Sequence, residues 1–183
     1  MAKKKTVKMR GKPLALAGWP VEVGERAPEF NLLDNDLNEK FLADYKGKTL
    51  IISSVASLDT PVCDVETRRF NQAAAGLGED VTVLTVSMDL PFAQKRWCAS
   101  AGIDKVVTLS DHRHGSFGWA YGVLIEDLRL LARAVFVIDK EGIIRYIQLV
   151  DEVTDEPDYD EVLNAVEALL QNREVTVGSS ATG

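Results

Sequence analysis

The sequence contains little cysteine: only Cys63 and Cys98 occur among its 183 residues. Two cysteines cannot build the framework of a disulfide-rich secreted domain. They also cannot supply the three or four soft ligands of a usual zinc site. Each cysteine is therefore catalytic, redox-active or an inert thiol, and an inert buried thiol is the default for a cysteine outside any motif.

Histidine is equally scarce. His112 and His114 lie in D-H-R-H-G, where their spacing could suit a metal ion. No cysteine stands near them, and Asp111 is the only neighbouring carboxylate of use to a metal. We interpret this segment as a polar loop and expect neither a metal nor another cofactor.

Long apolar runs are missing as well. No run approaches the roughly 18 apolar residues that span a bilayer, so we expect no membrane association. The apolar stretch at 14–17 is too short for a secretory signal, which favours a cytoplasmic protein. A formal net charge of -7 argues against general affinity for nucleic acid, whose phosphates are neutralised by Lys and Arg. We interpret the basic arm at 1–12 as a solvated end.

The remaining pattern alternates strands and helices. Period-two alternation predicts an N-terminal hairpin from Thr6–Arg10 and Leu14–Ala17 with a turn at 11–13, and residues 21–44 suit a second small hairpin. Further strands are predicted at 49–55, 81–87, 106–109, 133–138 and 143–147, and helices at 63–77, 91–101, 115–121 and 158–171.

This order of elements predicts an α/β fold, with a mixed central sheet flanked by helices. The length of the chain is that of one domain. We expect a single domain over residues 1–172, in which 1–20 form a hairpin extension, and a flexible tail at 173–183.

Cys63 directly follows a predicted buried strand and opens a predicted helix. The N–H groups in the first turn of a helix lack partners within the helix, and together with the helix dipole they favour an anion. The sulfur is therefore well placed to be a thiolate, the nucleophilic form of cysteine. Thr60, three positions earlier, could offer its hydroxyl to this sulfur or could cap the helix.

Cys98 lies far along the chain in another predicted helix, so the sequence lacks the C-x-x-C pair of dithiol oxidoreductases. A disulfide between the two cysteines would need Cα atoms about 4.4 to 6.8 Å apart. Closing it from two helical positions would require local unwinding. The residues alone also allow Cys98 to be a core thiol on an amphipathic helix.

Four longer segments, in the same order, resemble the thiol peroxidase branch of the peroxiredoxins. They are S-S-V-A-S-L-D-T-P-V-C-D-V-E-T-R-R-F-N, M-D-L-P-F-A-Q-K-R-W-C, A-R-A-V-F-V-I-D and Q-L-V-D-E-V-T-D-E-P-D-Y-D. The resemblance runs from Thr6 to Leu170. It implies a thioredoxin-like fold and an atypical two-cysteine peroxiredoxin, which works without a prosthetic group.

The resemblance also implies a role for four residues. Cys63 would be the thiolate that attacks hydrogen peroxide or an organic hydroperoxide and becomes a sulfenic acid. Cys98 would then close an intramolecular disulfide. Thr60 would hydrogen-bond to the thiolate and the peroxide, and Arg133, on a strand, would hold the thiolate and polarise the departing oxygen. In this family thioredoxin is the reductant, homodimers are usual, and the role is antioxidant defence.

One position departs from the family pattern P-x-x-x-T-x-x-C, because Ala56 stands where the proline is expected. Proline would fix the φ angle and shield the thiolate. Alanine leaves the unfolded loop freer, an effect of about 0.4 to 1 kcal/mol. We therefore expect peroxide reduction to continue at a reduced rate.

Two other classes of protein stay open. In a redox sensor the same disulfide would change a binding surface, and turnover would be incidental. In a thioredoxin-fold binding module both thiols would be inert. Steady consumption of peroxide with thioredoxin and its reductase distinguishes the enzyme from both.

Overall fold

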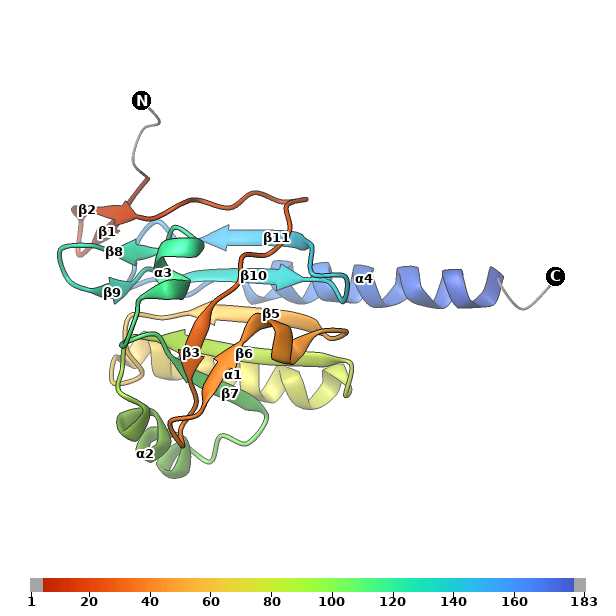
Figure 1. Cartoon of the computed structure of the whole chain (residues 1–183), viewed down its shortest axis with the longest axis horizontal. Helices are drawn as coiled ribbons and strands as arrows, with labels where there is room; N and C mark the ends of the chain where they lie inside the picture. Colours follow the sequence, from red (N-terminus) through yellow and green to blue (C-terminus); the bar gives the residue numbers. More distant parts are fainter. Residues whose placement is uncertain (1–4, 180–183) are drawn as a thin grey trace.

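A computed structural model describes residues 5–179 (Figure 1). The strands are β1 (Thr6–Met9), β2 (Lys12–Ala17), β3 (Asn31–Leu33), β4 (Glu39–Phe41), β5 (Thr49–Ser54), β6 (Val81–Ser87), β7 (Val106–Ser110), β8 (Leu124–Ile125), β9 (Leu130–Leu131), β10 (Ala134–Ile138) and β11 (Ile144–Leu149). The helices are η1 (Leu42–Tyr45, 3-10), α1 (Pro61–Leu77), α2 (Pro91–Ala101), α3 (Ser116–Ala120) and α4 (Tyr159–Ser179).

The central sheet has seven strands in the order β11-β10-β5-β6-β7-β3-β4. Strands β5, β6 and β7 are parallel, whereas β10, β11, β3 and β4 join by antiparallel pairing. The predicted mixed sheet flanked by helices is therefore confirmed. Connections through α1 and α2 link the parallel strands, as the long crossover between parallel neighbours requires.

The two faces of this sheet bury different sets of side chains, because successive residues of a strand point to opposite faces. One face packs Ile51, Val83 and Val135 against Phe70 of α1 and Val162 of α4. In Figure 1, α4 runs along β10 and β11 and continues past their ends.

The opposite face carries an aromatic cluster. The rings of Phe117 and Tyr121 stack with centroids 4.4 Å apart, and both meet the ring of Phe136 edge-on. Each such side chain contributes about 1.5 to 3 kcal/mol by burial. The two layers cover both faces of the sheet and fix where the ends of its strands lie.

The N-terminal hairpin forms part of a second, four-stranded sheet in the order β1-β2-β8-β9. The sequence predicted β1 and β2 but not the two-residue strands β8 and β9. The turn is at Arg10 and Gly11, which have φ of 51° and 77°, and not at the predicted residues 11–13. Pro13 lies within β2, in the part that pairs only with β1.

Three further boundaries differ from prediction. Helix α1 begins at Pro61, because proline suits the first turn of a helix, so Cys63 is the third residue of α1. Arg133 immediately precedes β10 and does not belong to the strand. Helix α4 continues to Ser179, through most of the segment expected to be a flexible tail, and residues 180–183 lie outside the described part of the chain.

Candidate active site

Antiparallel pairing of β10 with β5 explains how two distant residues meet. Ala134, the first residue of β10, pairs with Ser54, the last residue of β5. The chain leaves β5 through a short loop into α1, which carries Cys63. Arg133 and Cys63 therefore approach the same end of the sheet, although they are far apart in the sequence.

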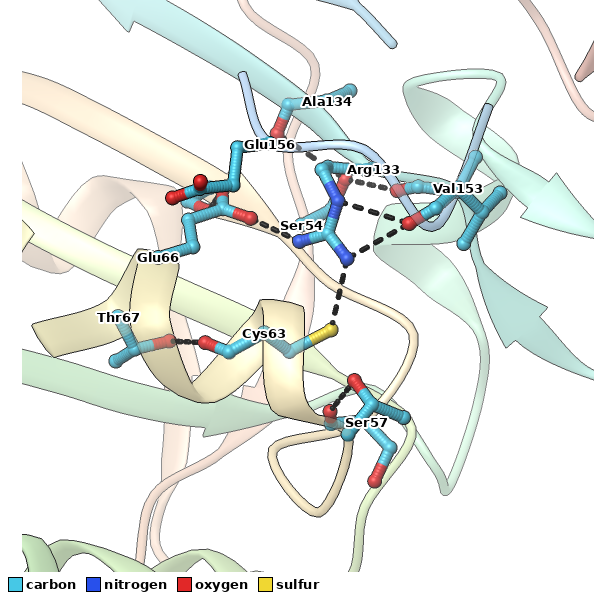
Figure 2. A network of polar contacts seen from close by, with 12 residues as sticks. Ser54, Ser57, Cys63, Glu66, Thr67, Arg133, Ala134, Val153 and Glu156 are labelled. Atoms are coloured by element: carbon cyan, nitrogen blue, oxygen red, sulfur yellow. Dashed lines mark hydrogen bonds and ion pairs between the residues drawn. The ribbon is translucent and has the colours of Figure 1, made fainter. Parts of the chain in front are cut away.

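Cys63 lies in the first turn of α1 and is only 1% exposed. Its sulfur accepts a hydrogen bond from Nη2 of Arg133 at 3.2 Å. Figure 2 shows the guanidinium directed at the sulfur, on the side of α1 that faces β10. The contact places a fixed positive charge directly beside the sulfur.

Arg133 is itself 1% exposed, and each of its three guanidinium nitrogens has a partner. Nε and Nη2 donate to the carbonyl oxygen of Val153 at 3.1 and 2.9 Å, and Nη1 forms an ion pair with Glu66. Burial acts to lower the pKa of Arg133, but the charges of Glu66 and Cys63 outweigh it and raise that pKa. Arg133 is therefore a permanent cation whose position is set from three sides.

Glu66 is a site residue that the sequence did not reveal. It is fully buried, accepts a hydrogen bond from Oγ of Ser53 at 2.6 Å, and pairs with Arg133 through its other oxygen. Burial raises the pKa of Glu66, while Arg133 and Ser53 oppose that rise. The signal was its spacing: Glu66 lies three positions after Cys63, so both side chains share one face of α1.

Thr60 is placed differently from expectation. It is the residue before α1, but its side chain does not cap the helix. Instead its hydroxyl donates to the carbonyl oxygen of Ser57 at 2.8 Å. A hydroxyl has one proton, so the oxygen of Thr60 is left as an acceptor, and it lies in the wall of the pocket described next.

A pocket of about 480 Å³ opens above Arg133. Apolar side chains form most of its wall, and the N-terminal hairpin supplies one side of it. Its lining includes Met9, Leu14, Ala56, Thr60, Val62 and Arg133. The pocket therefore places a small or medium-sized apolar molecule beside Arg133, the residue that contacts Cys63.

Cys98 lies on α2 in a different environment. It is half-buried, and its sulfur lies 3.4 Å from Oγ1 of Thr108 on β7. Both cysteines are free thiols. The structure thus brings Cys63 and Arg133 into contact and places Thr60 at the same pocket, whereas Cys98 is held apart against β7.

None of the helices between residues 5 and 179 combines the length and the apolar character needed to cross a membrane. In the same part of the chain, no three side chains from His, Cys, Asp or Glu gather where they could hold a metal ion.

Known proteins share both the sequence and the fold. A thiol peroxidase of Bacillus subtilis (strain 168) is 55% identical over 165 residues, which are 90% of this chain and 98% of that protein. A peroxiredoxin-like protein from Aquifex aeolicus superposes with a TM-score of 0.84 at 51% identity, covering 90% of this chain and 96% of that one. A thiol peroxidase from Chromobacterium violaceum, 22% identical, shares the fold with a TM-score of 0.80 over 93% and 98% of the two chains.

The sequence and the fold that the chain shares with these proteins identify it as a peroxiredoxin-type oxidoreductase, a thiol-dependent peroxidase. The family model described as Redoxin matches residues 22–163. The chain therefore belongs to the Redoxin family and, within it, to the thiol peroxidases.

Proposed function

We propose that this peroxidase reduces hydrogen peroxide and organic hydroperoxides at Cys63, closes a disulfide with Cys98, and is recycled by thioredoxin in antioxidant defence. The observation that carries the proposal is the 3.2 Å contact between Nη2 of Arg133 and the sulfur of Cys63 beside an open pocket. The proposal includes a cytoplasmic homodimer.

In the first step the Cys63 thiolate attacks the terminal oxygen of the hydroperoxide. An S–O bond forms, the O–O bond breaks, and the departing alkoxide or hydroxide takes a proton to leave as an alcohol or water. Cys63 becomes a sulfenic acid. Negative charge grows on the departing oxygen, and the fixed cation of Arg133 lies where it stabilises that charge.

Thr60 suits the task of holding the hydroperoxide. Because its proton is donated to Ser57, its oxygen can accept the O–H of a bound hydroperoxide, which points the O–O bond at the sulfur. This role replaces a direct hydrogen bond from Thr60 to the thiolate. The apolar wall of the pocket supports organic hydroperoxides as substrates alongside hydrogen peroxide.

In the second step the thiol of Cys98 attacks the sulfenic sulfur of Cys63. The new S–S bond replaces the S–O bond, and the released hydroxide combines with the thiol proton as water. Cys98 is oxidised and Cys63 is reduced, so no further oxidant is consumed. Both residues lie within helices, so at least one helix must unwind locally to reach disulfide geometry.

The test compares wild type with Cys63→Ser and Cys98→Ser. Peroxide consumption is followed with thioredoxin, its reductase and NADPH, and the products of one equivalent of peroxide are weighed by mass spectrometry. We expect steady turnover and a disulfide in wild type, no reaction in Cys63→Ser, and one added oxygen without a disulfide in Cys98→Ser.

Two results would contradict the proposal. Equal rates in all three proteins would show that neither cysteine takes part. A single stoichiometric oxidation of wild type, without turnover, would identify a redox sensor in place of an enzyme supported by thioredoxin.

A further inference from the structure

Three side chains join the helix of Cys63 to the helix of Cys98. The indole Nε1 of Trp97 donates to Oδ1 of Asp64 at 2.9 Å, and Nε of Arg68 donates to Oδ2 of the same carboxylate at 2.9 Å. The guanidinium of Arg68 also lies 5.8 Å from the centre of the Trp97 ring. We call Asp64, Arg68 and Trp97 the interhelix latch.

A fourth contact extends this latch to the end of α2. Nη1 of Arg68 donates to the carbonyl oxygen of Ala101, the last residue of the helix, at 3.1 Å. That carbonyl has no partner further along its own helix, so the arginine satisfies it. The latch therefore fastens the first two turns of α1 to the last turn of α2.

The position of the latch in the sequence links it to the two sulfurs. Asp64 follows Cys63 directly, and Trp97 precedes Cys98 directly. The sulfur of Cys63 contacts Arg133, whereas that of Cys98 contacts Thr108, so the two thiols are held on different partners. Unwinding at Cys63 or at Cys98 also moves its neighbour, Asp64 or Trp97, and so loads the hydrogen bond between these two residues.

We propose that the interhelix latch holds the two cysteine helices in the reduced arrangement, and that its release limits the rate at which the disulfide closes. The inference rests on the proposed function, since it concerns the attack of the Cys98 thiol on the Cys63 sulfenic acid, with loss of water. Asp64, Arg68 and Trp97 are positioning residues, because they touch neither sulfur nor peroxide.

The latch has a consequence for damage by excess peroxide. A sulfenic acid that waits for Cys98 can react with a second hydroperoxide, which transfers one oxygen to give a sulfinic acid and leaves as an alcohol or water. A weaker latch shortens this wait. Loss of the latch should therefore speed disulfide closure and reduce the share of sulfinic product.

The main test is Trp97→Phe, which keeps an aromatic ring but removes the N–H donor. After one equivalent of hydrogen peroxide, rapid quenching with a thiol-blocking reagent and mass analysis follow the sulfenic acid and the disulfide separately. We expect closure to accelerate about tenfold, equivalent to about 1.4 kcal/mol, while the formation of the sulfenic acid keeps the wild-type rate. Arg68→Met, which removes the contacts with Asp64 and Ala101, should act in the same direction.

Trp19→Phe is the matched control, because Trp19 is 78% exposed and belongs to the segment after β2. It should leave both rates unchanged. A merely structural role of Trp97 would lower the melting temperature without separating the two rates. The proposal is overturned if both latch variants form the disulfide at the wild-type rate or more slowly. A wild-type protein that forms no disulfide would instead overturn the proposed function, and the latch proposal with it.

Discussion

The two cysteines of this chain have the same chemistry in isolation and opposite surroundings. Cys63 is buried, and a cation held on three sides contacts its sulfur. Cys98 is half-buried on α2, and its polar neighbour is the neutral hydroxyl of Thr108. The first environment places a positive charge at a fixed point beside the sulfur, whereas the second leaves a sulfur on a helix near the surface. Under the proposed function, the first arrangement suits the nucleophile and the second suits the residue that moves to meet it.

Arg133→Met should have the largest effect on the reaction at Cys63. Without the guanidinium, neither the thiolate nor the departing oxygen is stabilised, and the rate of sulfenic acid formation should fall about 10²- to 10³-fold. Stopped-flow fluorescence under single-turnover conditions measures this step. Arg145→Met is the control, because Arg145 pairs with Asp139 on the rim of the sheet and should have no effect.

Two companion variants make this test decisive. The double variant Arg133→Met/Glu66→Gln removes the unpaired buried carboxylate and so separates lost catalysis from lost stability. Thr108→Val removes the polar neighbour of Cys98 with little change in shape, and it should leave the first step at the wild-type rate. A comparable loss in Thr108→Val would show that the two environments are not functionally distinct.

The largest effect on stability should come from Glu66→Gln. The glutamine cannot balance the buried charge of Arg133, so the free energy of unfolding should fall by about 3 kcal/mol. Urea unfolding followed by circular dichroism measures it. Glu167→Gln, on the exposed side of α4, should change stability by no more than about 0.5 kcal/mol. An equally small change in Glu66→Gln would mean that Glu66 is not the counter-ion of Arg133.

The sequence predicted most of this fold because most of its signals are local. Apolar runs identified β5, β6 and β10, and proline and glycine identified the ends of α2. The strands β8 and β9 were missed because two residues are too few to show a period. Their place depends on pairing with the hairpin, which is a tertiary contact.

The site was predictable only in part for the same reason. The helix start gave a local argument for Cys63, but nothing nearby distinguishes Arg133 from Arg129 or Arg145, so its role rested on resemblance. Glu66 could have been suspected from its place on the same helix face as Cys63. The carbonyl of Val153, which orients Arg133, leaves no mark in the sequence because every residue has one.

Ala56→Pro should restrict the conformation of the loop that leads to Cys63. Ala56 is 5% exposed, lines the pocket, and has a negative φ angle. Within the described part of the chain its N–H makes no backbone hydrogen bond, so proline would remove none. We expect a gain in stability of about 0.4 to 1 kcal/mol.

The same variant should raise the rate with hydrogen peroxide a few-fold, because a fixed loop holds the reacting geometry more often. The ring also fills part of the pocket, so KM for cumene hydroperoxide should rise. Steady-state kinetics with both substrates measures the difference. An unchanged rate with hydrogen peroxide would show that the expected penalty of alanine at this position does not exist.

Glu152→Gln should produce the smallest effect. It acts on the N-terminal hairpin, which forms one side of the pocket. The carboxylate accepts the N–H groups of Gly11 and Arg10 at 3.0 and 2.9 Å, and these bonds, that of Gly11 foremost, lower the pKa of Glu152 to about 2 from an ordinary 4.5. A carboxylate whose pKa is lowered by folding stabilises the folded state at pH values above its pKa in the unfolded chain. That contribution is lost as the pH falls from about 4.5 toward 2.

Hydrogen exchange of the Gly11 amide, followed by NMR from about pH 6 to about pH 3, reports the docking of the hairpin. After correction for intrinsic exchange, protection in wild type should decline as the pH falls, whereas Glu152→Gln should show weaker protection that barely depends on pH. Asp155→Asn removes a neighbouring exposed carboxylate and should behave as wild type.

Because the hairpin contributes Met9 and Leu14 to the pocket, Glu152→Gln should also raise KM for cumene hydroperoxide modestly while leaving KM for hydrogen peroxide unaffected. Equal pH dependence in wild type and Glu152→Gln would show that another group docks the hairpin. The pocket wall would then be independent of the Glu152 carboxylate.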